Sequence, residues 1–267
     1  MKRGSEMTAE KATAQEATRK VAFAKVLAIQ IIAYVVLVAL ALVPGMMYGD
    51  AAKPAAVPFT IIASLAMVVL LVAFSPFRDG VAGHVIAAIA GLLSAICATT
   101  VMLGNVIFPA GLDGGKSFSM EEAWIAGVGG LLIVLIIVSF GRQMARENRT
   151  HLIRSLSHSV VEGVAMIASA GWCFLPVLLP TTHSRAAAMS AASGATVDMF
   201  SNVTTTWVVA AIVTVLVAVA LTVCSYFWHR DADPEPDARS PWIGLALLPV
   251  MLTGLAVGLA ALAIVVL

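Results

Sequence analysis

The chain has 267 residues, of which 60% are hydrophobic and 12% are charged, and its formal net charge is +1. A soluble domain is roughly half apolar and about one quarter charged, so this composition excludes an ordinary water-soluble globular protein and favours a chain that is solvated by lipid. The near-neutral balance gives no electrostatic basis for binding nucleic acid.

The chain opens with a polar segment of mixed charge, residues 1–20, which we interpret as a cytoplasmic tail. Residues 21–267 then consist of apolar runs, each long enough to cross a hydrocarbon core about 30 Å thick, which takes roughly 20 residues of helix. The sequence predicts an all-α, polytopic integral membrane bundle of about seven helices in a single transmembrane domain. The predicted spans lie near 21–43, 58–77, 81–104, 123–141, 159–180, 203–227 and 242–265.

The first span has an alternative interpretation as a cleaved signal segment. Ala39-Leu40-Ala41 resembles a signal-peptidase site that follows a basic region. The apolar run is longer than that of a usual signal peptide, and the polar segment before it is also long. We therefore expect this span to be retained, and cleavage would not change the orientation of the other spans.

Charge in the loops predicts the orientation of the chain. With the N-terminus inside, the inner segments contain thirteen of the sixteen Lys and Arg residues, and the outer segments contain only Lys53, Lys116 and Arg185. Short cytoplasmic loops are enriched in Lys and Arg, so this distribution predicts an N-terminus inside and a C-terminus outside. The expected location is the cell membrane, specifically a bacterial cytoplasmic membrane.

Small residues recur at helical spacing in two predicted spans. Gly83, Ala87, Gly91 and Ala95 follow one another every four residues in the third span, and Gly254 and Gly258 form a GxxxG pattern in the last. Such faces let two helices approach closely. We expect packing within the bundle, and an interface with a partner subunit or a second copy of the chain is the alternative.

Few ionisable residues lie at membrane depth, and such residues are candidates for function because burying them is costly. His84 and Glu162 each lie about one turn inside the predicted cytoplasmic interface. Arg154, His158 and Glu162 are four residues apart and share one helical face. We expect Glu162 to pair with His158, His84 or Lys25 in a structural role. A proton or cation entry point is the alternative.

The segment between the fourth and fifth spans is the most basic internal stretch, with Arg142, Arg146, Arg149 and Arg154. The positive-inside signal accounts for these residues. Contact with anionic lipid headgroups or with a cytoplasmic partner is the alternative, because such headgroups attract each nearby Lys or Arg by about 1 kcal/mol.

Large aromatic residues near the predicted span ends are expected to anchor the bundle at the two membrane interfaces. They are Trp124, Trp172, Trp207, Phe227, Trp228 and Trp242.

No catalytic, nucleotide-binding or metal-binding motif stands out in the chain, so the sequence predicts no catalytic residue, no cofactor and no metal. Three classes of function remain open. A non-catalytic membrane scaffold or accessory subunit is favoured, with membrane lipids and another membrane subunit or a second copy as partners. The alternatives are a small transporter or permease component with a polar site at Glu162 and His84, and an intramembrane enzyme acting on lipid-linked substrates.

Overall fold

The computed structural model describes residues 23–42, 52–75, 77, 80–101, 119–145, 152–178, 202–231 and 240–266. This part of the chain contains helices and no strand. A first helix at Phe23–Leu42 is followed by α2 (Ala52–Ala73), α3 (Gly80–Thr99), α5 (Met120–Met144), α6 (Leu152–Ser169), the 3₁₀ helix η2 (Ala170–Phe174), α7 (Leu175–Leu178), α9 (Asn202–Asp231) and α10 (Pro241–Val266).

Among the described residues, six helices are long and apolar enough to cross a membrane, with α6, η2 and α7 continuing one another in a single candidate span from Leu156 to Leu178. The helix α2 contributes a shorter apolar stretch at Pro58–Ala73. The predicted all-α, polytopic membrane bundle is therefore confirmed. The predicted tail at residues 1–20 lies outside the described residues.

Local sequence signals explain where two helices begin. The helix α5 starts at Met120 because Ser119 and Glu122 form a capping box. The Glu122 backbone N–H donates to Ser119 Oγ at 3.2 Å, and the Ser119 N–H donates to Glu122 Oε2 at 2.8 Å. The helix α10 starts at Pro241, a position where the missing N–H of proline has no helical partner to lose.

The apolar stretch of α2 begins at Pro58, where the second span was predicted to start, but the helix itself begins earlier. Pro54 and Pro58 suggested a connector before residue 58, whereas α2 already begins at Ala52 and contains both prolines. Pro54 lies in the first turn, where proline is tolerated because the N–H groups there have no partner within the helix. The helix α6 begins at Leu152, and the candidate span that it opens begins at Leu156, three residues before the predicted start near residue 159.

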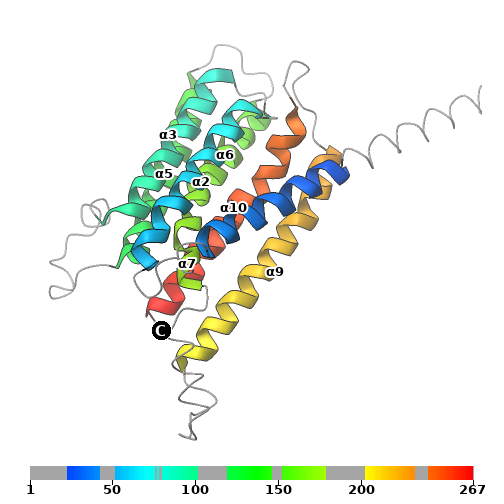
Figure 1. The fold of residues 1–267 in the computed structure, drawn as a ribbon. Helices are drawn as coiled ribbons and strands as arrows, with labels where there is room; N and C mark the ends of the chain where they lie inside the picture. Colours follow the sequence, from blue (N-terminus) through cyan, green and yellow to red (C-terminus); the bar gives the residue numbers. More distant parts are fainter. Residues whose placement is uncertain are drawn as a thin grey trace, which may run out of the picture.

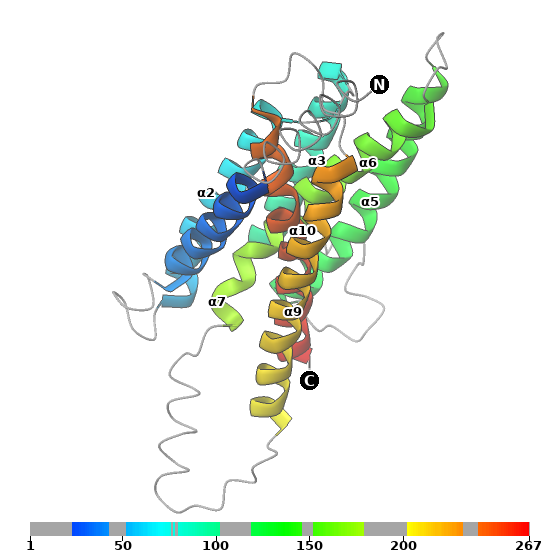
Figure 2. The ribbon, with the colours of Figure 1, turned by 90° about the vertical axis from the view of Figure 1, so that its right-hand side faces the viewer.

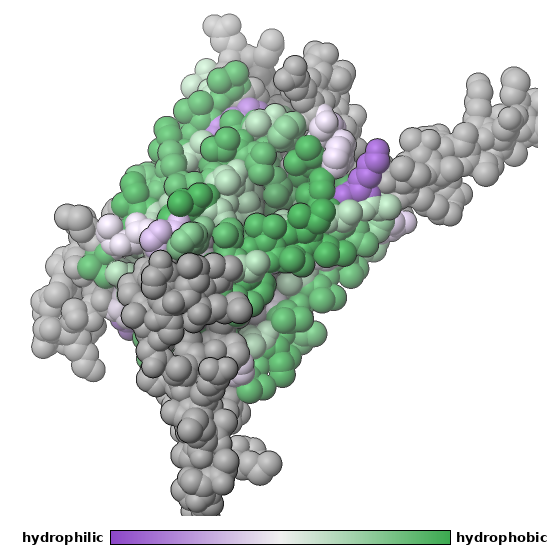
Figure 3. Space-filling model, in the orientation of Figure 1, coloured by the Kyte–Doolittle hydropathy of each residue, from purple (hydrophilic) through white to green (hydrophobic). Residues whose placement is uncertain are grey.

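The helices form two groups that share α10 (Figures 1 and 2). In the first group α3 packs against α5 and α6, and α2 packs against α3 and η2. The helix α10 lies between this group and α9, with contacts to α6, η2 and α9. The first helix crosses obliquely near α9 and α10 (Figure 1). Hydrophobic side chains cover most of the coloured part of the face in view, as a lipid-exposed surface requires (Figure 3).

Candidate functional site

The main polar contact at membrane depth joins α3 and α6. His84 Nδ1 lies 2.9 Å from both carboxylate oxygens of Glu162. The Glu162 side chain is fully buried, and the His84 side chain is 18% exposed. With a proton on Nδ1, the imidazole donates a hydrogen bond to the carboxylate. The carboxylate thus has a partner in a place where an unpaired charge would cost several kcal/mol.

Small residues bring α3, α5 and α6 close enough for this contact. A Cβ atom built on Gly91 of α3 would lie 3.0 Å from Cβ of Met166 on α6. One built on Gly163, next to Glu162, would lie 2.5 Å from Cδ2 of Leu135 on α5. Gly91 therefore lets α3 approach the backbone of α6 closely, and Gly163 leaves room for the Leu135 side chain of α5. The carboxylate therefore lies among helices rather than at the lipid surface.

The structure selects one of the three partners considered for Glu162. His84, on a neighbouring helix, makes the contact. His158, one turn before Glu162 on α6, packs its ring against Phe77 at a centroid distance of 5.0 Å. Lys25 Nζ lies 6.0 Å from the ring centroid of Trp242.

Further polar side chains are buried on α5 and α6 near the same end of the helices. Ser139 and Gln143 are each 2% exposed and follow Leu135 at intervals of four residues on one face of α5. Ser159, one turn before Gly163 on α6, is 4% exposed. Sequence reasoning missed this polar face, although the four-residue spacing was a usable signal. Ser139 Oγ has no hydrogen-bond partner among the described residues.

A second polar network connects the first helix with α9 and α10. Gln30 Nε2 donates to Ser225 Oγ at 3.0 Å, and that hydroxyl donates to the Thr222 carbonyl at 2.6 Å. The hydroxyls of Tyr34 and Thr253 lie 2.9 Å apart. Since the Thr253 hydroxyl donates to the Pro249 carbonyl at 2.8 Å, Tyr34 is the donor between them. Each Ser or Thr hydroxyl thus satisfies a backbone carbonyl and accepts from another helix.

The predicted role of two tryptophans as interfacial anchors was wrong. Trp124 is fully buried and Trp172 is 3% exposed. Trp124 Nε1 donates to Ser94 Oγ at 3.1 Å, and Trp172 Nε1 donates to the Val250 carbonyl at 2.9 Å. The large rings fill space beside glycines of α10, and their N–H groups find acceptors on neighbouring helices.

The small-residue faces identified in the sequence lie inside the bundle. Gly83, Ala87, Gly91 and Ala95 of α3 are all buried. A Cβ on Gly254 would meet the Ala168 carbonyl oxygen, and one on Gly258 would meet the ring of Trp124. In this structure the GxxxG pattern of α10 is covered by helices of the same chain.

The basic segment is described only in part. Arg142 lies in the last turn of α5 and is half-buried. Arg146 and Arg149 lie outside the described residues, and the same holds for the side chain of Arg154 near the start of α6. The predicted contact with lipid or a partner at this segment stays a prediction.

The described part of the chain contains no group of three or more His, Cys, Asp or Glu residues placed to hold a metal ion. The His84–Glu162 pair has the chemistry to share a proton and to hold two helices together. These features define a polytopic helical membrane protein whose polar side chains at membrane depth are largely paired between helices. No protein-family model, no curated protein and no solved structure matches the chain. Its function is therefore inferred from its own geometry.

Proposed function

We propose that the chain is a non-catalytic membrane scaffold or accessory subunit that acts through its helix faces. The observation that carries this proposal is the pairing of Glu162, whose two carboxylate oxygens both face His84 in a fully buried position. A carboxylate held in this way stabilises a helix contact and is poorly placed to receive a passing solute. The polar network of the first helix with α9 and α10 supports the same role.

The helix α9 supplies the surface through which such a subunit would meet another membrane protein. It packs chiefly against α10 and leaves long apolar side chains facing outward, including Val215 and Leu216, each 61% exposed. Without a hydrophobic driving force in lipid, helix association depends on packing and on hydrogen bonds. The proposed partner is another membrane subunit that packs along this helix.

A small transporter component is the second candidate, and one observation favours it. His84 is 18% exposed and contacts the fully buried Glu162, so the pair extends from the protein surface into the bundle. A proton that reaches His84 could pass to Glu162. Onward transfer needs further titratable groups at greater depth. Neutral Gln, Ser, Thr, Tyr and Trp side chains make several of the hydrogen bonds that join the described helices deeper in the bundle.

The function is tested by ion flux and by crosslinking. Proteoliposomes containing the chain should dissipate a pH gradient no faster than empty liposomes, and Glu162→Gln should not change the rate.

In native membranes, a photo-crosslinking residue at Leu216 should trap one discrete adduct. The same residue at Ile137 of α5, which is 64% exposed, is the matched control and should give none. Glu162-dependent acidification would favour the transporter, and equal labelling at both positions would contradict a scaffold that acts through α9.

The proposed membrane is a bacterial cytoplasmic membrane, with the N-terminus inside and the C-terminus outside. Two contacts support this orientation. The rings of Phe23 and Tyr226 lie 5.0 Å apart, and Lys25 Nζ lies 6.0 Å from the Trp242 ring centroid. The start of the first helix, the end of α9 and the start of α10 therefore share one end of the bundle. In the sequence, the tail and the loop that adjoin these helix ends carry much of the positive charge.

Reporter fusions test this orientation. Fusions at Gly45, Gly114 and Gly194 are expected to report an external location, and a fusion at Pro234 an internal one, because the loops rich in Lys and Arg stay in the cytoplasm. Paired alkaline phosphatase and fluorescent reporters measure both sides. The reverse pattern at all four sites would overturn the orientation.

A further inference from the structure

The buried carboxylate of Glu162 needs more hydrogen-bond donors than its partner supplies. Within the described part of the chain, both of its oxygens face a single nitrogen, Nδ1 of His84, at 2.9 Å. One N–H group cannot point well at both oxygens, and a carboxylate has about four lone-pair positions for donors. A charged group in the interior needs such further hydrogen bonds to offset its lost hydration.

Ser139 on α5 has the complementary need, because it is a buried donor without an acceptor. Its side chain is 2% exposed, and its Oγ has no hydrogen-bond partner among the described residues. A Ser or Thr inside a helix often donates to the carbonyl four residues before it, as Thr214 and Thr222 do on α9. The Ser139 hydroxyl makes no such bond, so it is available to another group.

Chain connectivity makes α5 and α6 antiparallel neighbours. The helix α5 ends at Met144, and α6 begins at Leu152. The seven residues between them can span at most about 25 Å, whereas α5, with 25 residues, is about 37 Å long. The two helices also pack against each other and lie side by side (Figure 2). The end of α5 is therefore level with the start of α6.

The crossing at Gly163 determines which side chains of the two helices face each other. A Cβ built there would lie 2.5 Å from Cδ2 of Leu135 on α5. One turn nearer the end of α5 and the start of α6, Ser139 follows Leu135 and Ser159 precedes Gly163. At about 100° per residue, Ser159 points between Gly163, which faces α5, and Glu162, which faces α3. Ser139, Ser159 and Glu162 therefore line one interface, where α3, α5 and α6 contact one another.

A water molecule satisfies both needs at this interface. It can accept a hydrogen bond from the Ser139 hydroxyl and donate one to the Glu162 carboxylate, and buried waters typically make about three such bonds. Ser159, which is 4% exposed, supplies a third polar group. A metal ion fits less well, because the described residues form no group of three or more His, Cys, Asp or Glu ligands.

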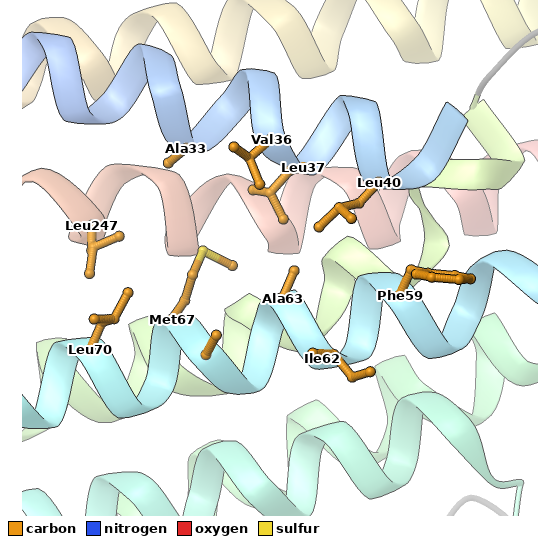
Figure 4. A pocket seen from close by; sticks show the side chains of 11 residues that line it. Ala33, Val36, Leu37, Leu40, Phe59, Ile62, Ala63, Met67, Leu70 and Leu247 are labelled. Carbon is orange, nitrogen blue, oxygen red and sulfur yellow. The ribbon is translucent and has the colours of Figure 1, made fainter. Parts of the chain in front are cut away.

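The cleft between the first helix and α2 offers the opposite environment. Apolar side chains alone line it, including Ala33 and Leu37 of the first helix and Met67 of α2 (Figure 4). Such a surface gives water no hydrogen-bonding partner. Internal hydration is therefore expected at the interface of α3, α5 and α6 and not in this cleft.

We propose that this interface binds an internal water molecule between Ser139 and Glu162. The water accepts from the Ser139 hydroxyl and donates to the carboxylate. It thereby connects α5 to the contact between α3 and α6, and the His84–Glu162 pair is a hydrated site rather than a dry ion pair.

Water-edited solid-state NMR of the protein in lipid bilayers tests this proposal. The method follows the transfer of magnetisation from water protons to isotope-labelled serine carbons. Transfer to the Ser139 Cβ should build up several-fold faster than transfer to the Ser94 Cβ. Ser94 is the matched control, because it is also fully buried but its hydroxyl donates to the Ile167 carbonyl at 2.7 Å and accepts from Trp124 Nε1 at 3.1 Å.

A substitution at Ser139 tests whether the same water reaches Glu162. Ser139→Val removes the hydroxyl and fills the space with a methyl group, so transfer from water to the Glu162 carboxyl carbon should fall several-fold. The signal of this carbon is identified by its loss in Glu162→Gln. Val138→Ala, at a 40% exposed position of the same helix, is the control and should leave the transfer unchanged.

Three results would overturn the proposal. One is equal build-up at Ser139 and Ser94 in the unmodified protein, a comparison that needs no variant. Another is unchanged transfer to Glu162 in a Ser139→Val variant whose size-exclusion profile shows that it folds. The third is a sodium-dependent shift of the Ser139 and Glu162 signals without water transfer, which would assign the interface to a cation.

Discussion

Replacing His84 with alanine is expected to destabilise the bundle by about 3–5 kcal/mol, because removing one partner of a buried pair leaves the other charge uncompensated. Glu162 is fully buried and has both carboxylate oxygens 2.9 Å from His84 Nδ1, so the alanine variant leaves this carboxylate without its partner. The measurement is the free energy of unfolding in mixed detergent micelles. Val85→Ala, on an exposed position of the same helix, is the control.

Combining His84→Ala with Glu162→Gln shows whether the uncompensated charge on Glu162 causes the loss of stability. Glu162→Gln alone should cost only about 1 kcal/mol, since the amide still makes a hydrogen bond to the imidazole. In the His84→Ala background the same change should recover much of the lost stability, because the buried group is then neutral. Independent, additive effects would mean that the two side chains do not interact. An His84→Ala variant as stable as Val85→Ala would also contradict the assigned pairing.

The second large loss of stability is expected from replacing a glycine where η2 crosses α10. A Cβ on Gly171 would meet the backbone carbonyl oxygen of Gly254, and a Cβ on Gly254 would meet the backbone carbonyl oxygen of Ala168. Backbone atoms cannot move aside by changing rotamer, so Gly171→Ala or Gly254→Ala should push the two segments apart. Overpacking of this kind costs typically 1–3 kcal/mol and occasionally more. The melting temperature in detergent should fall accordingly.

Gly129→Ala on α5 is the matched control, because no atom lies within 4 Å of its built Cβ. Alanine is favoured over glycine inside a helix by up to about 1 kcal/mol, so this variant should be as stable as the unmodified protein or more so. The double change Gly171→Ala with Gly254→Ala should cost less than the sum of the two, since both act at one contact. Equal tolerance of all three single changes would mean that this crossing is not closely packed.

The position of the apolar helices follows from the sequence because it depends on local properties. A long run of apolar side chains in lipid must form a helix to satisfy its own backbone hydrogen bonds. Helix starts also carry local signals, such as the capping box at Ser119 and Glu122 and the proline at Pro241. The connector expected at Pro54 and Pro58 is instead part of α2, and proline is acceptable in the first turn of a helix, where Pro54 lies.

The pairing of polar side chains depended on tertiary structure. Sequence reasoning marked Glu162 as a residue in need of a partner and proposed three, but the choice among them depends on how α3 and α6 are rotated and how deeply each sits. The close contact of Gly91 on α3 with Met166 on α6 is one of the tertiary contacts that fix both. His84 and Glu162 are 78 positions apart in the chain, so no local pattern connects them.

The tryptophans show the same division between local and long-range information. Near the end of an apolar helix a tryptophan can anchor at the membrane surface or fill space between helices, and its neighbours in sequence are compatible with both. Trp124 and Trp172 are buried because glycines of α10 leave room for their rings and because Ser94 and the Val250 carbonyl accept their N–H groups. The sequence by itself determined that the chain is solvated by lipid, where its apolar helices lie and how few charged residues lie at membrane depth. Tertiary packing decided which helices meet and which polar groups pair, because those contacts join residues that are distant in the chain.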